Sequence, residues 1–214
     1  MRYLVVCGGK IDKEFGLNEI KTDGIDAIIA ADSGMDFLYE NGVTPDIIVG
    51  DSDSATTKAL EFFERKGQTE IHRLNPIKDD TDTEYAIRLA IREGARSIVV
   101  LGATGSRIDH VLGNISLLGI GLESKTDISI IDTNNRIRMA DKPVTIEKSA
   151  QYGRFVSLIA VTDDNEVSLK GFKYPVTDYS FDRFTSLGIS NEIVDDHALI
   201  DIHRGKFIII ESKD

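Results

Sequence analysis

The chain has 214 residues, and its 36 Asp and Glu residues outnumber its 25 Lys and Arg residues, which gives a net charge of −11. This length fits one large domain or two small ones, and an apolar fraction of 41% is typical of a globular protein. The acidic charge argues against nucleic acid or an anionic membrane as a partner, because both attract Lys and Arg. With a single cysteine, Cys7, and with no signal-peptide or membrane-spanning pattern, we expect a cytoplasmic protein.

The first part of the chain alternates short β-branched runs with longer stretches of helical spacing. The runs that we interpret as strands are 3–7, 26–31, 46–49, 70–74, 97–101 and 128–132. The stretches that we interpret as helices are 34–41, 57–66, 81–93 and 110–118. Strands that alternate with helices of this length predict βαβ units, so we expect a Rossmann-like α/β domain with a parallel sheet.

The pattern changes after about residue 133, where short strand-like runs follow one another with turn residues between them. These runs are 136–140, 144–147, 155–161, 166–169, 192–195, 198–203 and 206–211. Such spacing is typical of an antiparallel β-sandwich or barrel. We therefore divide the chain into an α/β domain, residues 1–132, and an antiparallel β domain, residues 133–214.

Small and polar residues follow each of the first five predicted strands. In a parallel sheet these segments share the edge formed by the carboxyl ends of the strands, and open α/β sheets bind their ligands there. The segments are 8–9, 32–34, 50–54, 75–82 and 102–109. We therefore expect a binding site at this edge.

A magnesium site is one interpretation of the acidic residues at this edge. Asp51 and Asp53 lie two residues apart, so both can face one cation, and Mg²⁺ takes one or two carboxylates. The alternative is a solvated turn, because Asp and Ser are common turn formers. Thr81 and Glu84 form a capping-box pattern, which predicts that Asp82 lies in the first turn of a helix at the same edge. There Asp82 can join the metal site or only complement the helix dipole.

Two basic residues near the same edge suit a phosphate group. Lys78 can contact a phosphate oxygen as a point charge. Arg107 lies in a Gly-containing loop that enters a helix, a place that favours anions, and its guanidinium fork matches phosphate. Asp109 either caps this helix or orients Arg107. The sequence contains neither a Walker A motif nor the full dinucleotide fingerprint, which argues against a P-loop NTPase and a Rossmann dehydrogenase.

Five segments together resemble the motifs of the thiamine pyrophosphokinase family. They are ADSG at 31–34, GDSDS at 50–54, KDDTDTEYA at 78–86, GATGSRIDH at 102–110 and GISNE at 188–192, in the family's order. The family's architecture, an α/β domain followed by a β-sandwich, is similar to the division drawn above. The resemblance implies that diphosphate is transferred from ATP to the hydroxyl of thiamine, which gives thiamine diphosphate and AMP.

The resemblance also implies a role for individual residues, with ATP as co-substrate and Mg²⁺ as cofactor. Asp51, Asp53 and Asp82 would hold Mg²⁺ against the phosphates. The nucleotide and phosphate pocket would be lined by Asp32, Ser33, Lys78, Thr81, Arg107 and Asp109. The residues expected to act in catalysis are Asp51, Asp53, Asp82, Arg107 and Asp109, with Asp82 or Asp109 accepting the hydroxyl proton.

On the thiamine side, the resemblance implies that Ser190 and Asn191 contact the substrate. The family works as a homodimer with thiamine near the subunit interface, so the sandwich would provide both thiamine and dimer contacts. From the residues alone, the segment 185–192 is better explained as a plain turn between strands. Two other functions stay open: another Mg²⁺-dependent phosphotransferase or phosphohydrolase at the same edge, and a nucleotide-binding or ligand-sensing module without activity.

Overall fold

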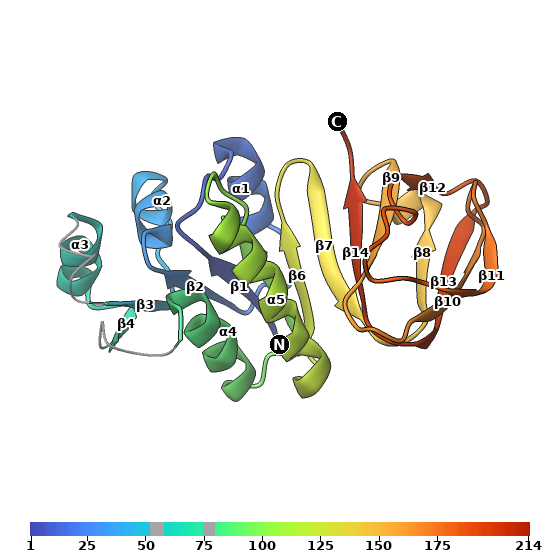
Figure 1. Ribbon diagram of the computed structural model, residues 1–214. Helices are drawn as coiled ribbons and strands as arrows, with labels where there is room; N and C mark the ends of the chain where they lie inside the picture. Colours follow the sequence, from blue (N-terminus) through green and yellow to red (C-terminus); the bar gives the residue numbers. More distant parts are fainter. Residues whose placement is uncertain (52–57, 75–79) are drawn as a thin grey trace. The chain divides into compact units, whose positions relative to one another are not determined.

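The computed structural model describes residues 1–51, 58–74 and 80–214 (Figure 1). The chain divides into two compact units, Met1–Thr133 and Asn134–Asp214. The boundary between the units lies one residue beyond the position expected from the sequence pattern. The first unit is α/β with a parallel sheet and the second is an antiparallel β-sandwich, which confirms the predicted fold class.

Among the described residues of the first unit, six parallel strands form a sheet in the order β6-β5-β1-β2-β3-β4. The chain builds outward from β1 to β4 and then returns to place β5 and β6 on the other side of β1. The order therefore reverses between β1 and β5, which is where open α/β sheets leave a crevice. The strands are β1 (Arg2–Val6), β2 (Ala27–Ala31), β3 (Ile47–Asp51), β4 (Glu70–Leu74), β5 (Ser97–Leu101) and β6 (Asp127–Ile131).

Helices cover both faces of this sheet, with α1, α2 and α3 on one face and α4 and α5 on the other (Figure 1). Right-handed crossovers require this division when the direction of winding reverses. The central strands are almost wholly apolar because both of their faces are buried, whereas the edge strand β4 contains Glu70, His72 and Arg73. The helices are α1 (Lys13–Ile20), α2 (Gly34–Glu40), α3 (Lys58–Lys66), α4 (Asp82–Arg92) and α5 (Ile108–Ser124).

The second unit is a sandwich of two antiparallel sheets, β12-β9-β14-β7 and β11-β10-β13-β8. Its core is built from inward-facing residues of both sheets, such as Phe207 and Leu158 from the first sheet and Val167 and Ile200 from the second. The strands are β7 (Asn135–Ala140), β8 (Val144–Glu147), β9 (Phe155–Ala160), β10 (Glu166–Lys170), β11 (Val176–Ser180), β12 (Asn191–Glu192), β13 (His197–Arg204) and β14 (Phe207–Ser212).

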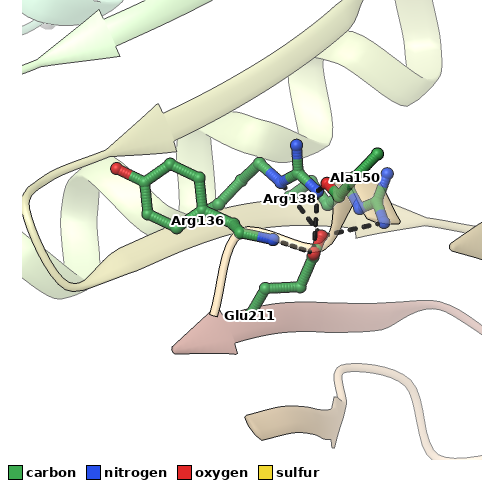
Figure 2. A network of polar contacts seen from close by, with 5 residues as sticks. Arg136, Arg138, Ala150 and Glu211 are labelled. Atoms are coloured by element: carbon green, nitrogen blue, oxygen red, sulfur yellow. Dashed lines mark hydrogen bonds and ion pairs between the residues drawn. The ribbon is translucent and has the colours of Figure 1, made fainter. Parts of the chain in front are cut away.

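A buried carboxylate, Glu211 near the end of β14, is held by two arginines of β7 (Figure 2). Arg136 donates to it from Nε at 2.9 Å and from Nη2 at 2.7 Å, and Arg138 donates from Nη2 at 3.1 Å. The main-chain N–H of Tyr152 adds a bond of 2.9 Å. Glu211 has no exposed surface, so these contacts replace the water that would otherwise solvate its charge.

Four elements, α1, β11, β12 and α5, differ clearly from the sequence-based expectation. Helix α1 was not predicted, because Gly16 lies in its middle and its apolar residues do not form a strong stripe, although Asp12 caps it by accepting a bond from Phe15 N at 2.9 Å. Strand β11 was not predicted either; it is polar, and Asp178 within it has a left-handed backbone with φ of 46°. The strand expected at 192–195 is only the two-residue β12, and α5 is longer than the expected 110–118.

Candidate active site

A cleft of about 830 Å³ opens at the carboxyl edge of the parallel sheet, at the switch point between β1 and β5. Its walls come from the turns that follow β1, β2 and β5 and from the first turns of α4 and α5. The sequence pattern predicted a site at this edge. The volume suits a ligand of nucleotide size, because ligand pockets commonly occupy ~300–1,000 Å³.

The floor of the cleft depends on glycines that let two turns approach each other. The N–H of Gly9 donates to the carbonyl of Gly102 at 2.9 Å. A Cβ atom on Gly9 would lie 2.2 Å from that carbonyl oxygen, and one on Gly102 would lie 2.4 Å from the carbonyl oxygen of Cys7. Gly102 also has a left-handed φ of 68°. Side chains at these two positions would therefore push the turns after β1 and β5 apart.

Asp32 follows β2 and lines the cleft from an unusual backbone conformation. Its φ is 53°, which Asp tolerates better than most residues, and its N–H donates to Val49 O at 2.8 Å. Ser33 is the N-cap residue of α2, where its side chain makes no capping bond. Its hydroxyl lies so close to Gly8 that a Cβ there would be 2.0 Å from Oγ. Asp32 thus lines the cleft directly, and Ser33 lies beside it.

The start of α4 places Thr81 and Asp82 in the cleft. Thr81 caps the helix by accepting a bond from Glu84 N at 3.2 Å, as the sequence pattern predicted. The reciprocal half of the capping box is replaced by an ion pair, because Glu84 binds Arg88 at 2.8 Å. Asp82 is half-buried in the first helical turn, where it lines the cleft and complements the helix dipole.

The thiol of Cys7 lies at the floor of the cleft, and its pKa depends on burial and on the charged and polar groups near it. Burial raises the pKa of Cys7 to about 12, while the hydroxyl of Thr83, which donates to Sγ at 3.4 Å, lowers it. The negative charges of Asp32 and Asp82 raise this pKa further. The Cys7 thiol is therefore neutral near pH 7, and both carboxylates contribute to keeping it neutral.

Arg107 and Asp109 form an exposed pair on the wall of the cleft. Arg107 donates from Nη2 at 2.6 Å and from Nε at 3.2 Å, and His110 N adds a bond of 3.0 Å to Asp109. These bonds lower the pKa of Asp109 to about 2, with Arg107 as the largest cause. Of the two roles considered for Asp109, the structure selects orientation of Arg107, because the N-cap residue of α5 is Arg107 itself.

Asn114 also lines the cleft, although sequence analysis did not single it out. Its Nδ2 donates to the carbonyl of Ala103 at 2.9 Å and so ties α5 to the turn after β5. The available signal was an amide side chain in an otherwise apolar stretch of helix.

The two residues expected to contact thiamine lie in the second unit. Ser190 is exposed and has a left-handed φ of 59°, and its N–H donates to Ser157 Oγ at 3.0 Å. Asn191 is buried, and its amide is used on the main chain of Tyr174: Oδ1 accepts from Tyr174 N at 3.1 Å and Nδ2 donates to Tyr174 O at 2.9 Å. Tyr174 itself is exposed, and sequence analysis missed it. Asn191 therefore presents Tyr174 at the surface.

Part of the expected metal and phosphate site cannot be placed. Asp53 and Lys78 lie outside the described residues, and Asp51 closes β3, with its side chain outside the description. Across residues 1–51, 58–74 and 80–214, no three His, Cys, Asp or Glu side chains are grouped as a metal site. The described residues thus contribute one expected metal ligand, Asp82.

The described cleft can bind an anionic ligand at a glycine-rich floor, with Arg107 on one wall and Asp32 and Asp82 beneath. Fold and site together define a phosphate-binding α/β protein with an appended β-sandwich. Within the described part of the chain, no helix has the length and apolar character needed to cross a membrane.

Comparison with known proteins shows which family within this class the chain resembles. A family model described as the catalytic domain of thiamin pyrophosphokinase matches residues 21–131, and one described as its vitamin B1 binding domain matches residues 143–207. The thiamine pyrophosphokinase of Bacillus subtilis (strain 168) is 34% identical over 188 residues, which cover 87% of each chain.

Solved structures agree with these matches. The crystal structure of the Bacillus subtilis enzyme has a TM-score of 0.88 at 30% identity and covers 100% of both chains. That of thiamin pyrophosphokinase from Geobacillus thermodenitrificans has a TM-score of 0.86 at 29% identity and covers 100% of this chain and 98% of the other. The Candida albicans enzyme shares the fold, with a TM-score of 0.80 at 20% identity over 99% of this chain and 90% of its own. The chain belongs to the thiamine pyrophosphokinase family.

Proposed function

We propose that this chain transfers the diphosphoryl group of ATP to the hydroxyl of thiamine, which gives thiamine diphosphate and AMP. The observation that carries the proposal is the cleft at the switch point, where Asp32, Asp82 and Arg107 converge in a chain of this family. Residues 1–132 would bind ATP and the metal, and residues 133–214 would bind thiamine and a second copy of the chain. The free, buried thiol of Cys7 is consistent with the expected cytoplasmic location.

Mg²⁺ is proposed as the cofactor, with Asp51, Asp53 and Asp82 as its ligands. The donor set fits, because all three are carboxylates, which Mg²⁺ prefers, and Asp82 lies in the cleft. Asp32 and Asp82 both line the cleft, so negative charge is concentrated there, and a cation would relieve it. When bound, Mg²⁺ would neutralise charge on the phosphate oxygens.

The basic side chains of the cleft would orient the phosphates for in-line attack on the β-phosphorus. Arg107 would exchange Asp109 for a phosphate oxygen, since both accept from the same guanidinium fork, and Lys78 would add a point charge. While paired, Asp109 is a weak proton acceptor because its pKa is about 2. Once a phosphate replaces it on Arg107, Asp109 is released from this pair, so either Asp109 or Asp82 would accept the hydroxyl proton.

Thiamine would be held by the sandwich. Ser190 offers an exposed hydroxyl, and Tyr174 offers an exposed ring whose position is set by Asn191. An aromatic ring suits thiamine, because the substrate has two heteroaromatic rings and the thiazolium is cationic. In this account Asn191 contributes by holding Tyr174 and not by contacting thiamine itself.

A homodimer is proposed because large apolar side chains are exposed close in sequence to the expected contact residues of each unit. In the sandwich, Phe184 is 91% exposed and lies on the same loop as Leu187 and Ser190. In the first unit, Ile108 is 67% exposed at the start of α5, and Leu112 is exposed one turn later. Exposed apolar patches of this kind mark association surfaces. A second copy would cover them and combine the cleft of one chain with the sandwich of the other.

Product analysis tests the reaction. The chain is incubated with ATP, Mg²⁺ and thiamine, and the nucleotides are separated by chromatography. The expected products are AMP and thiamine diphosphate in equal amounts. ADP or inorganic phosphate as the main product would reject the transferase and favour another Mg²⁺-dependent phosphotransferase or a phosphohydrolase. Nucleotide binding without turnover would favour a sensing module.

Complementation tests the shared site. Arg107→Ala and Tyr174→Ala chains are expected to be weakly active alone. When the two are co-expressed, random pairing of chains should restore about a quarter of the wild-type sites, because one site of each mixed dimer receives both intact halves. Sedimentation velocity checks that the sample is dimeric. A monomer, or a mixture no more active than its parts, would contradict the shared site.

A further inference from the structure

The turn between β5 and α5, residues 102–107, is here called the β5–α5 loop, and it carries Arg107. Gly105, Ser106 and Arg107 are exposed in it, so the loop has little packing of its own at its outer end. A loop that must present Arg107 to a phosphate needs its backbone fixed by other parts of the unit. A misplacement of about 1 Å at a reacting group can cost on the order of 10²-fold in rate.

Three contacts provide this fixation. At its start, the loop rests on the turn after β1 through the bond from Gly9 N to Gly102 O. On one side, Thr104 Oγ1 donates to Asp132 Oδ2 at 2.7 Å, which links the loop to the end of β6. On the other side, Asn114 Nδ2 donates to Ala103 O at 2.9 Å, which links it to the second turn of α5.

Of the two bonds made by side chains, the one from Asn114 comes from a residue that also lines the cleft. Ala103 is buried, with 3% of its surface exposed, so its carbonyl has little access to water. Loss of the donor would leave this carbonyl unsatisfied and would let the loop move until the carbonyl finds a new partner. The loop would then lose its link to α5 at Ala103, four residues before Arg107.

We propose that Asn114 is a positioning residue for the phosphate-binding β5–α5 loop. It acts through the main chain of Ala103 and so sets where Arg107 meets the bound nucleotide. This inference rests on the proposed function, in which ATP occupies the cleft. It predicts that Asn114 affects ATP affinity and leaves thiamine affinity unchanged, because the thiamine contacts are proposed to lie on the sandwich.

Asn114→Asp is the sharpest test, because it keeps the size of the side chain and replaces the donated N–H by a carboxylate oxygen. We expect the KM for ATP to rise about tenfold, as for the loss of one buried hydrogen bond, and the KM for thiamine to stay within about twofold. Asn114→Ala should behave alike and serves if the Asp variant does not fold. Hydrogen exchange should become faster at the amides of Gly105 and Arg107 in both variants.

Asn41→Asp is the matched control. Asn41 Nδ2 also donates to a main-chain carbonyl, that of Phe37, at 2.8 Å, and it is also partly buried, but it does not line the cleft. Its KM for ATP should equal that of the wild type. An unchanged KM for ATP in both Asn114 variants, or an equal rise in Asn41→Asp, would overturn the proposal.

Calorimetry with ATP and Mg²⁺, without thiamine, separates this proposal from the proposed reaction. If the wild type binds ATP but forms no AMP, the reaction fails, and weaker ATP binding by Asn114→Asp still supports the positioning role. If the wild type does not bind ATP, both fail.

Discussion

Two arginine–carboxylate pairs in this chain have the same chemistry and opposite surroundings. In the cleft, Arg107 and Asp109 are 68% and 66% exposed. In the sandwich, Arg136 forms an ion pair with Glu211, whose side chain has no exposed surface. Water can replace either partner of the exposed pair, so a phosphate can do so as well. The buried pair cannot be opened without leaving an uncompensated charge, so it serves stability.

A similar contrast separates other polar side chains of the two units. Asn191 in the sandwich is buried and binds the main chain of Tyr174, whereas Asp32 and Asp82 line the cleft of the first unit. Substitutions in the cleft should therefore reduce activity more than stability. Substitutions of buried polar groups in the sandwich should do the reverse.

The largest expected effect comes from Asp82→Asn. We expect kcat/KM to fall roughly 10²–10³-fold, as for the loss of one electrostatic contact to the reacting groups, with an unchanged free energy of unfolding. Steady-state kinetics and urea denaturation measure the two quantities. Asp36→Asn, in the first turn of α2, is the control, because it removes a first-turn carboxylate that does not line the cleft. Equal losses in both variants would contradict the assignment of Asp82.

Glu211→Gln should show the opposite behaviour. Neutralising the carboxylate leaves Arg136 and Arg138 facing each other without their shared anion, and we expect the free energy of unfolding to fall by about 3–5 kcal/mol. Activity of the folded protein at low temperature should be kept. Glu192→Gln is matched, because Glu192 also binds two basic residues but is partly exposed. It should destabilise much less, and an equal effect would show that burial is not what distinguishes Glu211.

Asn191→Ala tests a residue that is buried in the sandwich and is also proposed to support thiamine binding. Loss of its bonds to Tyr174 should raise the KM for thiamine about tenfold and leave the KM for ATP unchanged. The control is Asn134→Ala, which removes an amide bond to Lys213 O at 3.0 Å elsewhere in the same unit. If the KM for ATP rises as much as that for thiamine, Asn191 does not act through the thiamine side.

The smallest effect concerns the titration of Asp109. Its pKa is about 2 because its charged form is bonded to Arg107, so the pair is intact above that pH and is lost only as the pH falls through it. In Arg107→Ala, the pKa should rise toward the ordinary aspartate value of about 4. Carbon NMR of the side-chain carboxyl group measures both values. An equal pKa in the two proteins would mean that Arg107 does not hold Asp109 in solution.

The order of elements and the edge that carries the site could be predicted from the sequence, because buried parallel strands are continuous apolar runs. Small or polar residues follow each of the first five runs. Four residues predicted for the pocket and one predicted metal ligand line one cleft: Asp32, Thr81, Arg107, Asp109 and Asp82. The cap formed by Thr81 was predictable because it depends on two residues that are only three positions apart in the sequence.

What escaped prediction depends on contacts between distant residues or on unusual backbone. One example is the hydrogen bond from Asn114 to Ala103, which joins residues 11 positions apart. Another is the bond from Asn191 to Tyr174, over 17 positions, and no local sequence pattern encodes either bond. Strand β11 contains the left-handed Asp178, which interrupts the alternation that marks a strand. Asp109 allowed two local roles, and only the geometry of Arg107 separates them.

The most direct test of the account is phosphorus NMR of one reaction mixture that contains the chain, ATP, Mg²⁺ and thiamine. The account predicts that the resonances of ATP decline while those of AMP and of thiamine diphosphate grow in equal amounts, and that Asp82→Asn nearly abolishes this change. Growth of ADP or inorganic phosphate in their place, or an undiminished rate in Asp82→Asn, would contradict it.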